Sequence, residues 1–196
     1  MPTKEKYIKI KSHILLKLGQ GLSKTLYYHS LHHTLDILKQ AERISKVENI
    51  NNEEDLFLLK VACLYHDSGF LTTYKGHEEA ACKLVKNELP GFNVSIKQID
   101  TICRLIVATK IPQSAETSLE EIICDADLDY LGRLDFFEIS NKLFLELKER
   151  KFVAGEPEWN LIQIKFFKQH RYFTSTNKNL REPVKQTHLE MIETLL

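Results

Sequence analysis

The sequence predicts an all-α protein built as one irregular helical bundle. Apolar residues recur at helical spacing along nearly the whole 196-residue chain, and no segment shows the sustained alternation of a half-buried strand. The periodic runs are separated by residues that cap or stop helices, without an internal repeat or a linker rich in Gly, Ser or Pro. Because 43% of the residues are hydrophobic, a chain of this length can bury one sizeable core. We therefore predict a single domain over residues 1–196.

Two helices are predicted in the first third of the chain. One face of the first helix is marked by apolar residues at helical spacing: Leu31, Leu35, Leu38 and Ile44. This helix would also carry His29 and His33, which are four residues apart and therefore neighbours on one face. The second helix has a buried stripe formed by Leu56, Leu59, Ala62 and Cys63. Gly69 would end it just after the pair His66 and Asp67, which places this pair at a helix C-terminal end, open to a cleft.

Caps and breaks divide the rest of the chain. Two serines are each followed three positions later by Gln or Glu, the pattern of a capping box that begins a helix: Ser95 with Gln98, and Ser118 with Glu121. The helices before them would be stopped by Pro90-Gly91 and Ile111-Pro112. Further helices are predicted at about 135–150, 157–170 and 183–195, the last two with Pro157 and Pro183 near their first turns.

Composition excludes several classes of protein. The charge is balanced, with 27 basic and 27 acidic side chains, which argues against a large nucleic-acid-binding surface. Lysines interrupt every apolar run near the N-terminus before it reaches the length of a signal-peptide core, and no stretch approaches a membrane span. The cysteines are widely spaced in apolar sequence and are predicted to be buried thiols: Cys63, Cys82, Cys103 and Cys124. We expect a cytoplasmic protein that binds neither nucleic acid nor membrane; the sequence indicates no oligomeric state.

Histidines and aspartates gather in three places. The segment YHSLHHTLDIL holds His29, His32 and His33, LYHDSGF holds His66 and Asp67, and CDADLDYLG holds Asp125, Asp127 and Asp129. Taken singly, each cluster is more often a set of surface or core residues than a set of ligands. Their order, His, then His-Asp, then Asp, each in a helical context, points to one site, because divalent metals accept mixed nitrogen and oxygen ligands. The sequence therefore predicts metal-assisted hydrolysis.

These three motifs resemble, in their order, the HD-domain superfamily of metal-dependent phosphohydrolases. The resemblance runs from about residue 28 to 133 and implies a fold of the HD-domain type. It also implies one divalent ion (Mn, Mg, Fe, Co, Ni or Zn) held by His33, His66, Asp67 and Asp127. Asp127 is preferred as the distal ligand because it follows a small residue and precedes an apolar one, and Asp125 remains the alternative. Asp129 would point away from both and is interpreted as a cap or a salt-bridge partner.

The resemblance also suggests catalytic residues. The opening from Tyr28 to His33 looks like the YHxxxH motif of cyclic-nucleotide phosphodiesterases, in which the first histidine is the proton donor and the second a ligand. This implies that His29 is a catalytic acid, with Asp67 as the other catalytic residue, and leaves His32 unassigned. A histidine with an ordinary pKa of about 6.5 suits proton transfer near neutral pH. The alternative for His29 is a histidine on the helix surface.

A phosphorylated substrate needs cations beyond the metal. The candidates for substrate binding are Lys75, His77, Lys110 and Arg133. Lys75 and His77 lie before a predicted helix, whose free backbone amides also favour anions. Lys110 stands where relatives with two metals often carry a further histidine pair, which favours one ion here. Ordinary solvated lysines are the alternative. Where many relatives have a carboxylate after the His-Asp pair, this chain has Phe70 and Leu71, and the nearest acidic replacements are Glu78 and Glu79.

One segment near the C-terminus, FFKQHRYFTST, is rich in aromatic residues. Its side chains could line a pocket that stacks a base and holds a phosphate, or could belong to the core: Phe166, Phe167, His170, Arg171, Tyr172 and Phe173. We predict a metal-dependent phosphohydrolase, a phosphoric ester hydrolase, acting on a small phosphorylated molecule with a nucleotide as the favoured class. The alternatives are a cyclic-nucleotide phosphodiesterase and a nucleotide-sensing module that does not turn over.

Overall fold

The computed structural model describes residues 3–196, which form helices and contain no strand, so the predicted all-α fold is confirmed. The helices are α1 (Thr3–Gly21), α2 (Leu31–Val47), α3 (Glu53–Tyr65), α4 (His77–Glu88), α5 (Ile96–Ala108), α6 (Ser118–Asp127), α7 (Phe136–Glu149), α8 (Glu156–Gln169), α9 (Ser175–Leu180) and α10 (Glu182–Glu193). Short 3-10 turns connect some of them: η1 (Ser68–Leu71), η2 (Leu89–Phe92) and η3 (Asp129–Gly132). Within the described residues, no helix combines the length and the apolar character that crossing a membrane requires.

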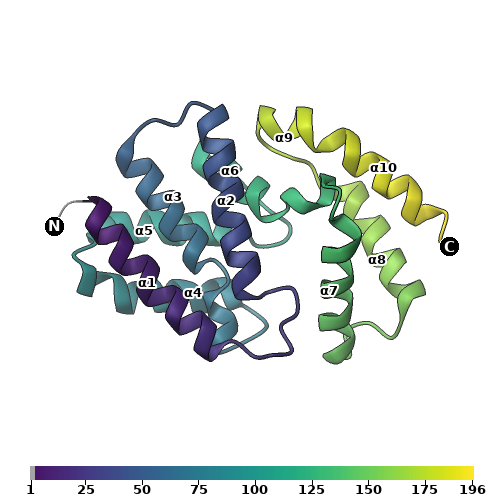
Figure 1. Ribbon diagram of the computed structural model, residues 1–196, viewed down its shortest axis with the longest axis horizontal. Coiled ribbons are helices and arrows are strands. Elements are labelled where there is room, and N and C mark those ends of the chain that lie inside the picture. Colours follow the sequence, from purple (N-terminus) through teal and green to yellow (C-terminus); the bar gives the residue numbers. More distant parts are fainter. Residues whose placement is uncertain (1–2) are drawn as a thin grey trace.

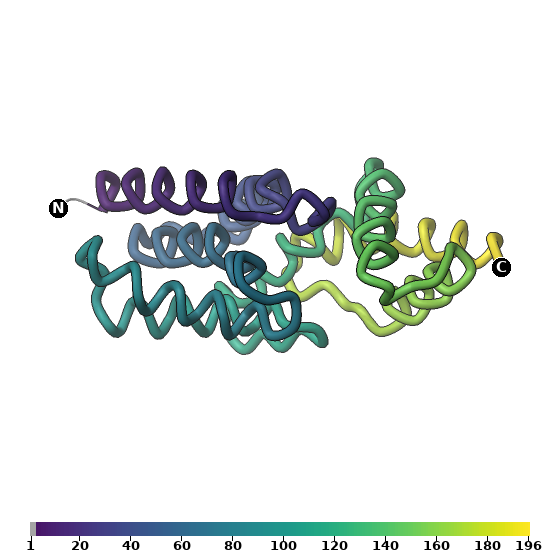
Figure 2. The backbone as a smooth tube through the Cα atoms, turned by 90° about the horizontal axis from the view of Figure 1, so that it is seen from below, coloured from purple at the N-terminus to yellow at the C-terminus, as the bar shows by residue number. Residues whose placement is uncertain are grey.

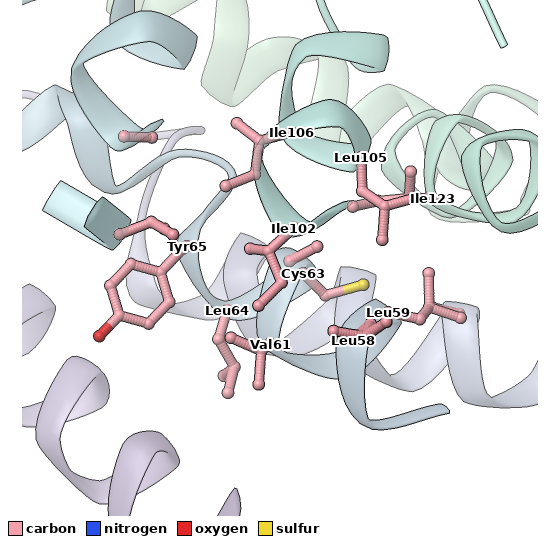
Figure 3. Packing of buried hydrophobic residues seen from close by; sticks show 14 of the residues in the cluster. Leu58, Leu59, Val61, Cys63, Leu64, Tyr65, Ile102, Leu105, Ile106 and Ile123 are labelled. Carbon is pink, nitrogen blue, oxygen red and sulfur yellow. The ribbon is translucent and has the colours of Figure 1, made fainter. Parts of the chain in front are cut away.

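The helices form two groups along the long axis of the molecule (Figure 1). Helices α1 to α6 make the N-terminal group, and α7 to α10 make the C-terminal group. Figure 2 shows α1 and the α4–α5 segment on opposite sides of α3, which packs against both α1 and α5. Helix α3 is therefore buried along almost its whole length from Phe57 to Tyr65. Its apolar side chains meet those of α5 and α6 in the core (Figure 3): Leu58, Leu59, Val61, Cys63, Leu64, Tyr65, Ile102, Leu105, Ile106 and Ile123.

Helix α2 begins later than predicted. Ser30 is its N-cap, so His29 lies in the preceding loop and the expectation that one helix carries both His29 and His33 is wrong. The buried face also differs from the predicted one, because Leu35 is 39% exposed. The side chains that face the core are instead His33, Thr34, Ile37, Leu38, Ala41 and Ile44. Because this face of α2 is the buried one, His33 points inward, toward the end of α3.

Helix α3 ends at Tyr65 with His66 as its C-cap, rather than at Gly69. The predicted place of His66 and Asp67 at a helix C-terminal end is nevertheless correct. Gly69 lies in η1, where an added Cβ would stand 1.9 Å from the carbonyl oxygen of His77. Only glycine allows this approach, and the approach seats the start of α4 against the turn that follows Asp67.

The remaining boundaries largely follow the predictions. The capping box at Ser95 is confirmed, whereas the second box uses Thr117 and Glu120, one residue before the predicted pair. The segment TSLEE can form either box, Thr117 with Glu120 or Ser118 with Glu121. The earlier one prevails because Glu120 also accepts hydrogen bonds from the backbone amides of Glu116 and Thr117. Helices α7, α8 and α10 match the predicted ranges within about two residues, α1 and α9 were not predicted, and the four cysteines are buried and free.

Candidate active site

Three helices bring the predicted metal ligands together. His33 lies in the first turn of α2, His66 and Asp67 follow α3, and Asp127 is the last residue of α6. The ligand atoms of His33, His66 and Asp127 all lie within 4.8 Å of one another. Asp67 Oδ2 lies 3.1 Å from His66 Nε2 and 3.5 Å from His33 Nε2, and Asp127 Oδ1 lies 3.3 Å from His33 Nε2. These four side chains therefore converge on one point, which we call the centre.

The side chains of this centre fit a divalent cation. His66 Nε2 and Asp67 Oδ2 are buried and form an ion pair with each other at 3.1 Å, but neither makes a hydrogen bond of good geometry, so both atoms keep unused bonding capacity that faces the centre. His66 Nδ1 donates to the carbonyl of Cys63 at 2.9 Å, which aims Nε2 at the centre, as is common for metal-binding histidines. Burial opposes charge on both residues, but their mutual attraction raises the pKa of His66 to about 9 and lowers that of Asp67 far below its usual range. Two imidazoles and two carboxylates suit first-row divalent metals.

His29 lies beside this centre and is held by a residue that the sequence did not indicate. Its Nδ1 is 2.5 Å from Oε1 of Glu146, a fully buried carboxylate on α7. Glu146 also accepts hydrogen bonds from the backbone amides of Tyr28 and His29 and from the Tyr74 hydroxyl. Burial opposes charge on His29, but the hydrogen bond with Glu146 and the nearby charge of Asp67 raise its pKa above the ordinary value. Nothing in the local sequence of α7 distinguishes Glu146 from a surface glutamate.

Phe70 supports two histidine rings at once. The ring centre of His29 lies 4.3 Å from that of Phe70, and the ring centre of His77 lies 4.1 Å from it, with both pairs stacked. His77 Nε2 is 3.5 Å from Asp67 Oδ1. The aromatic side chain that stands in place of the expected carboxylate after the His-Asp pair thus contacts both imidazoles, whose ring centres are 6.1 Å apart.

A cavity of about 280 Å³ opens beside the centre, between the two groups of helices. Its polar end is formed by His29, Asp67, His77, Glu78 and Asp127. Its apolar end includes side chains of α7 and α8: Leu143, Leu147, Trp159, Ile162 and Phe166. Its described lining contains neither lysine nor arginine. The arrangement joins a cluster of ionisable groups to an apolar chamber large enough for part of a small molecule.

Residues 27–130 match the HD domain family, which is more than half of the chain and includes all four candidate ligands. This chain belongs to the HD domain family. HD domains bind divalent metal ions, and their superfamily is one of metal-dependent phosphohydrolases. The predicted family is therefore confirmed.

Solved structures share the fold of this HD domain protein. Bacillus subtilis YpgQ in complex with ADP is similar with a TM-score of 0.66 and 18% identity, over 100% of this chain and 95% of that one. The Lin1889 protein from Listeria innocua has a TM-score of 0.64 and 20% identity, over 98% and 96%. A Lactobacillus plantarum protein has a TM-score of 0.69 and 19% identity, over 99% and 98%. Among curated proteins, none matches the sequence.

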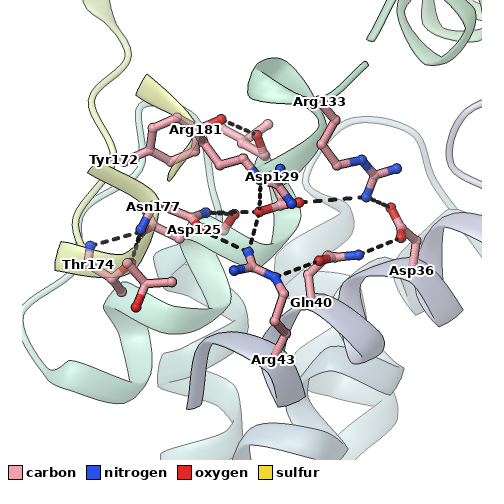
Figure 4. A network of polar contacts seen from close by, with 12 residues as sticks. Asp36, Gln40, Arg43, Asp125, Asp129, Arg133, Tyr172, Thr174, Asn177 and Arg181 are labelled. Atoms are coloured by element: carbon pink, nitrogen blue, oxygen red, sulfur yellow. Dashed lines mark hydrogen bonds and ion pairs between the residues drawn. The ribbon is translucent and has the colours of Figure 1, made fainter. Parts of the chain in front are cut away.

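The two other aspartates of the CDADLDYLG motif, Asp125 and Asp129, contact residues outside the centre. Asp125 accepts hydrogen bonds from the backbone amides of Phe173 and Thr174, at 2.8 Å each, and from the Thr174 hydroxyl at 2.6 Å. Burial raises the pKa of Asp125 to about 6. Asp129 lies beyond α6, in η3, and pairs with Arg43 and Arg181 (Figure 4). Asp125 therefore anchors the segment after α8, and Asp129 lies in a salt-bridge network, as the sequence suggested for it.

Three of the four predicted substrate-binding residues lie outside the cavity. Lys75 places its ammonium 5.9 Å from the ring centre of Phe152, and exposed Lys110 pairs with Glu79. Arg133 binds Asp36 and Asp135 at 2.7 Å each. The positive charges of these three side chains are therefore paired with carboxylates or directed away from the cavity. These contacts join segments distant in the chain, so the local sequence did not indicate them. Only His77 lines the cavity, together with Glu78, whereas His32 is exposed.

Proposed function

We propose that this chain is a metal-dependent phosphohydrolase that cleaves a phosphoric ester of a small molecule, with a nucleotide as the favoured substrate class. The observation that carries this proposal is the convergence of two buried atoms that make no hydrogen bond, His66 Nε2 and Asp67 Oδ2, with His33 and Asp127 at the polar end of a cavity. Membership of the HD domain family supports the reaction class. The ADP bound to Bacillus subtilis YpgQ, which has the same fold, supports the nucleotide.

In this proposal His33, His66, Asp67 and Asp127 hold one divalent ion. When bound, such an ion polarises a phosphoryl oxygen and lowers the pKa of a coordinated water from about 15.7 to about 7. Asp67 has a second oxygen, Oδ1, which faces His77 rather than the two ligand histidines. This oxygen is available to orient the attacking water toward phosphorus.

His29 is the proposed general acid. Because Glu146 occupies its Nδ1, the nitrogen left for the substrate is Nε2. A protonated Nε2 can donate its proton to the oxygen that leaves when the phosphoric ester is cleaved. The negative charge of Glu146 favours the protonated ring, and the stack on Phe70 fixes the plane in which the proton is offered.

The rest of the cavity suits an uncharged part of the substrate next to the phosphate. His77 supplies the only imidazole besides His29 among the described lining residues, and it faces the phosphate end. The side chains of Leu143, Leu147 and Trp159 exclude water from the other end. Water exclusion strengthens the interaction of charged groups at the reacting phosphate.

The test is metal analysis of the purified chain followed by a panel of substrates. We expect a stoichiometric divalent metal and release of phosphate from at least one nucleoside monophosphate, both lost in Asp127→Ala. Opening of a cyclic nucleotide, without hydrolysis of monoesters, would assign the chain as a phosphodiesterase instead. Tight nucleotide binding with no product from any ester would identify a sensor and refute the enzyme.

A further inference from the structure

A second cavity of about 270 Å³ adjoins the proposed active site and has no part in the mechanism above. We call it the α8-end pocket, because it surrounds the residues that follow α8; its side chains include Ile111, Gln113, Phe166, His170, Arg171 and Phe173. Ile111 and Phe166 line both cavities, so the two share a wall. A single ligand that occupies both cavities would pass beside Ile111 and Phe166.

Two buried polar atoms in this pocket have no partner: His170 Nε2 and Gln113 Oε1. The ammonium of Lys185 lies 3.2 Å from His170 Nδ1. Because an ammonium only donates, Nδ1 accepts and the ring proton is on Nε2. The amide nitrogen of Gln113 donates to the carbonyl of Cys124 at 3.1 Å, which leaves Oε1 as a free acceptor. The α8-end pocket thus presents one unpartnered donor and one unpartnered acceptor.

His170 is a neutral donor in this position. It is 8% exposed, and burial together with the charge of Lys185 lowers its pKa to about 3. Arg171 is charged but exposed, and its Nη1 donates to the backbone carbonyls of Lys168 and His170 at 2.8 Å each, which holds it at the rim of the pocket. The buried groups, His170 and Gln113, suit an uncharged ligand with a mixed hydrogen-bonding edge.

The walls of the pocket favour a flat ring. Of the aromatic residues in the segment from Phe166 to Phe173, Phe167 and Tyr172 belong to the core of the C-terminal group. Phe166 and Phe173 are only partly buried and line the α8-end pocket. Aromatic side chains are the usual surfaces on which planar heterocycles stack.

We propose that the α8-end pocket binds the nucleobase of the substrate whose phosphate lies at the metal centre. Every nucleobase carries hydrogen-bond donors and acceptors side by side on one edge, which matches the acceptor of Gln113 and the donor of His170. The span is short enough for one nucleotide. Gln113 binds the carbonyl of Cys124, three residues before Asp127 on α6, which is roughly 4.5 Å along the helix axis. This inference rests on the proposed function and adds the place where the base of its substrate binds.

The first test uses Gln113→Met, which keeps the length of the side chain and removes the acceptor. The measured quantity is the ratio of kcat/KM for a nucleoside monophosphate to kcat/KM for p-nitrophenyl phosphate, which has no base. We expect this ratio to fall about fivefold, the effect of one hydrogen bond between uncharged groups. Gln186→Met is the matched control, because this exposed glutamine on α10 donates only to Glu182 on the same helix, and its ratio should equal that of the wild type.

The second test needs no turnover. Adenosine, guanosine, cytidine and uridine are titrated into the full chain by calorimetry. We expect at least one to bind the wild type, more weakly to Gln113→Met, and not measurably to His170→Leu. An unchanged ratio in Gln113→Met, or no binding of any nucleoside to the wild type, overturns the inference while leaving metal-dependent hydrolysis of p-nitrophenyl phosphate, and hence the proposed function, intact. Nucleoside binding that depends on Gln113, without hydrolysis of any ester, supports the nucleobase site and overturns the proposed function.

Discussion

Glu146 holds His29 across the boundary between the two groups of helices, with Oε1 2.5 Å from Nδ1 although the residues are 117 positions apart in the chain. The same carboxylate accepts the backbone amides of Tyr28 and His29. The loop before α2 is therefore fixed at the cavity by a residue of α7. The C-terminal group has two effects on the site: it closes the apolar end of the cavity and it orients the proposed general acid.

Glu146→Gln should lower kcat while leaving metal content unchanged. The amide keeps the shape of the side chain but removes the negative charge that favours a protonated His29, and loss of such a supporting group typically costs about 10–100-fold. The measurement is kcat for an alkyl phosphate and for p-nitrophenyl phosphate, whose leaving group needs little proton transfer. Glu149→Gln is the control, since Glu149 is exposed on the same helix. Equal losses for both esters would show that Glu146 does not act through the acid.

Removing any proposed ligand should lower the metal content of the purified protein. His33→Ala, His66→Ala, Asp67→Ala and Asp127→Ala each delete one bond to the ion, which water replaces poorly. Asp125→Asn should keep the metal, because its carboxylate binds the backbone of Phe173 and Thr174. Metal analysis after dialysis measures the difference. Full occupancy in both His66→Ala and Asp67→Ala would refute the ligand set.

His77 and Lys110 should respond differently to substitution. His77 lines the cavity 3.5 Å from Asp67, so His77→Ala should lower kcat/KM for a nucleoside monophosphate about tenfold or more, the effect of a hydrogen bond to a charged group. The Lys110 ammonium pairs with exposed Glu79 outside the cavity, and exposed pairs of this kind contribute little because solvent screens them. Lys110→Ala should therefore keep kcat/KM within about twofold. A raised KM in Lys110→Ala would restore the substrate-binding role that the sequence suggested.

The fold could be predicted because its signals are local. Helical periodicity, the capping box at Ser95 and the prolines at the starts of α8 and α10 each act within a few residues. The errors are local as well. Helix α2 begins at Leu31, two positions after His29, which the predicted helix would have carried, and Thr117 rather than Ser118 caps α6.

The candidate site could be predicted only in part. The order of the His and Asp motifs indicated which side chains converge, since those motifs carry a recognisable spacing. The roles of the neighbouring carboxylates depend on segments distant in sequence. Asp125 accepts hydrogen bonds from the backbone amides of residues 173 and 174, and Asp129 forms ion pairs with Arg43 and Arg181. Glu146 has the sequence context of an ordinary amphipathic helix. Its function arises from a contact that no local pattern encodes.

The chain is expected to unfold as one domain. Buried polar contacts of Glu146, Asp125 and Asp129 join the two groups of helices, so that neither group keeps its surroundings when the other unfolds. Trp159 is the only tryptophan and lies in the C-terminal group, so its fluorescence follows that group, whereas circular dichroism follows all helices. In urea the two transitions should coincide. Separate midpoints would show that the groups are two domains.

Asp129→Ala should destabilise the protein more than any surface substitution. The Asp129 side chain is almost completely buried, and Oδ1 lies 2.7 Å from Arg43 on α2 and 3.0 Å from Arg181 at the end of α9, with Asn177 also donating to it (Figure 4). Its removal leaves two guanidinium groups without their shared carboxylate, and breaking a buried pair in this way costs about 3–5 kcal/mol. Urea denaturation gives the free energy of unfolding. Glu138→Ala is the control, since its pair with Lys142 is exposed and contributes about 0.3–0.5 kcal/mol.

Because Asp129 lies outside the centre, Asp129→Ala should still bind metal under conditions where it is folded. A loss below about 1 kcal/mol would mean that the two arginines find other partners or water, and the link between α2, η3 and α9 would then rest on apolar packing.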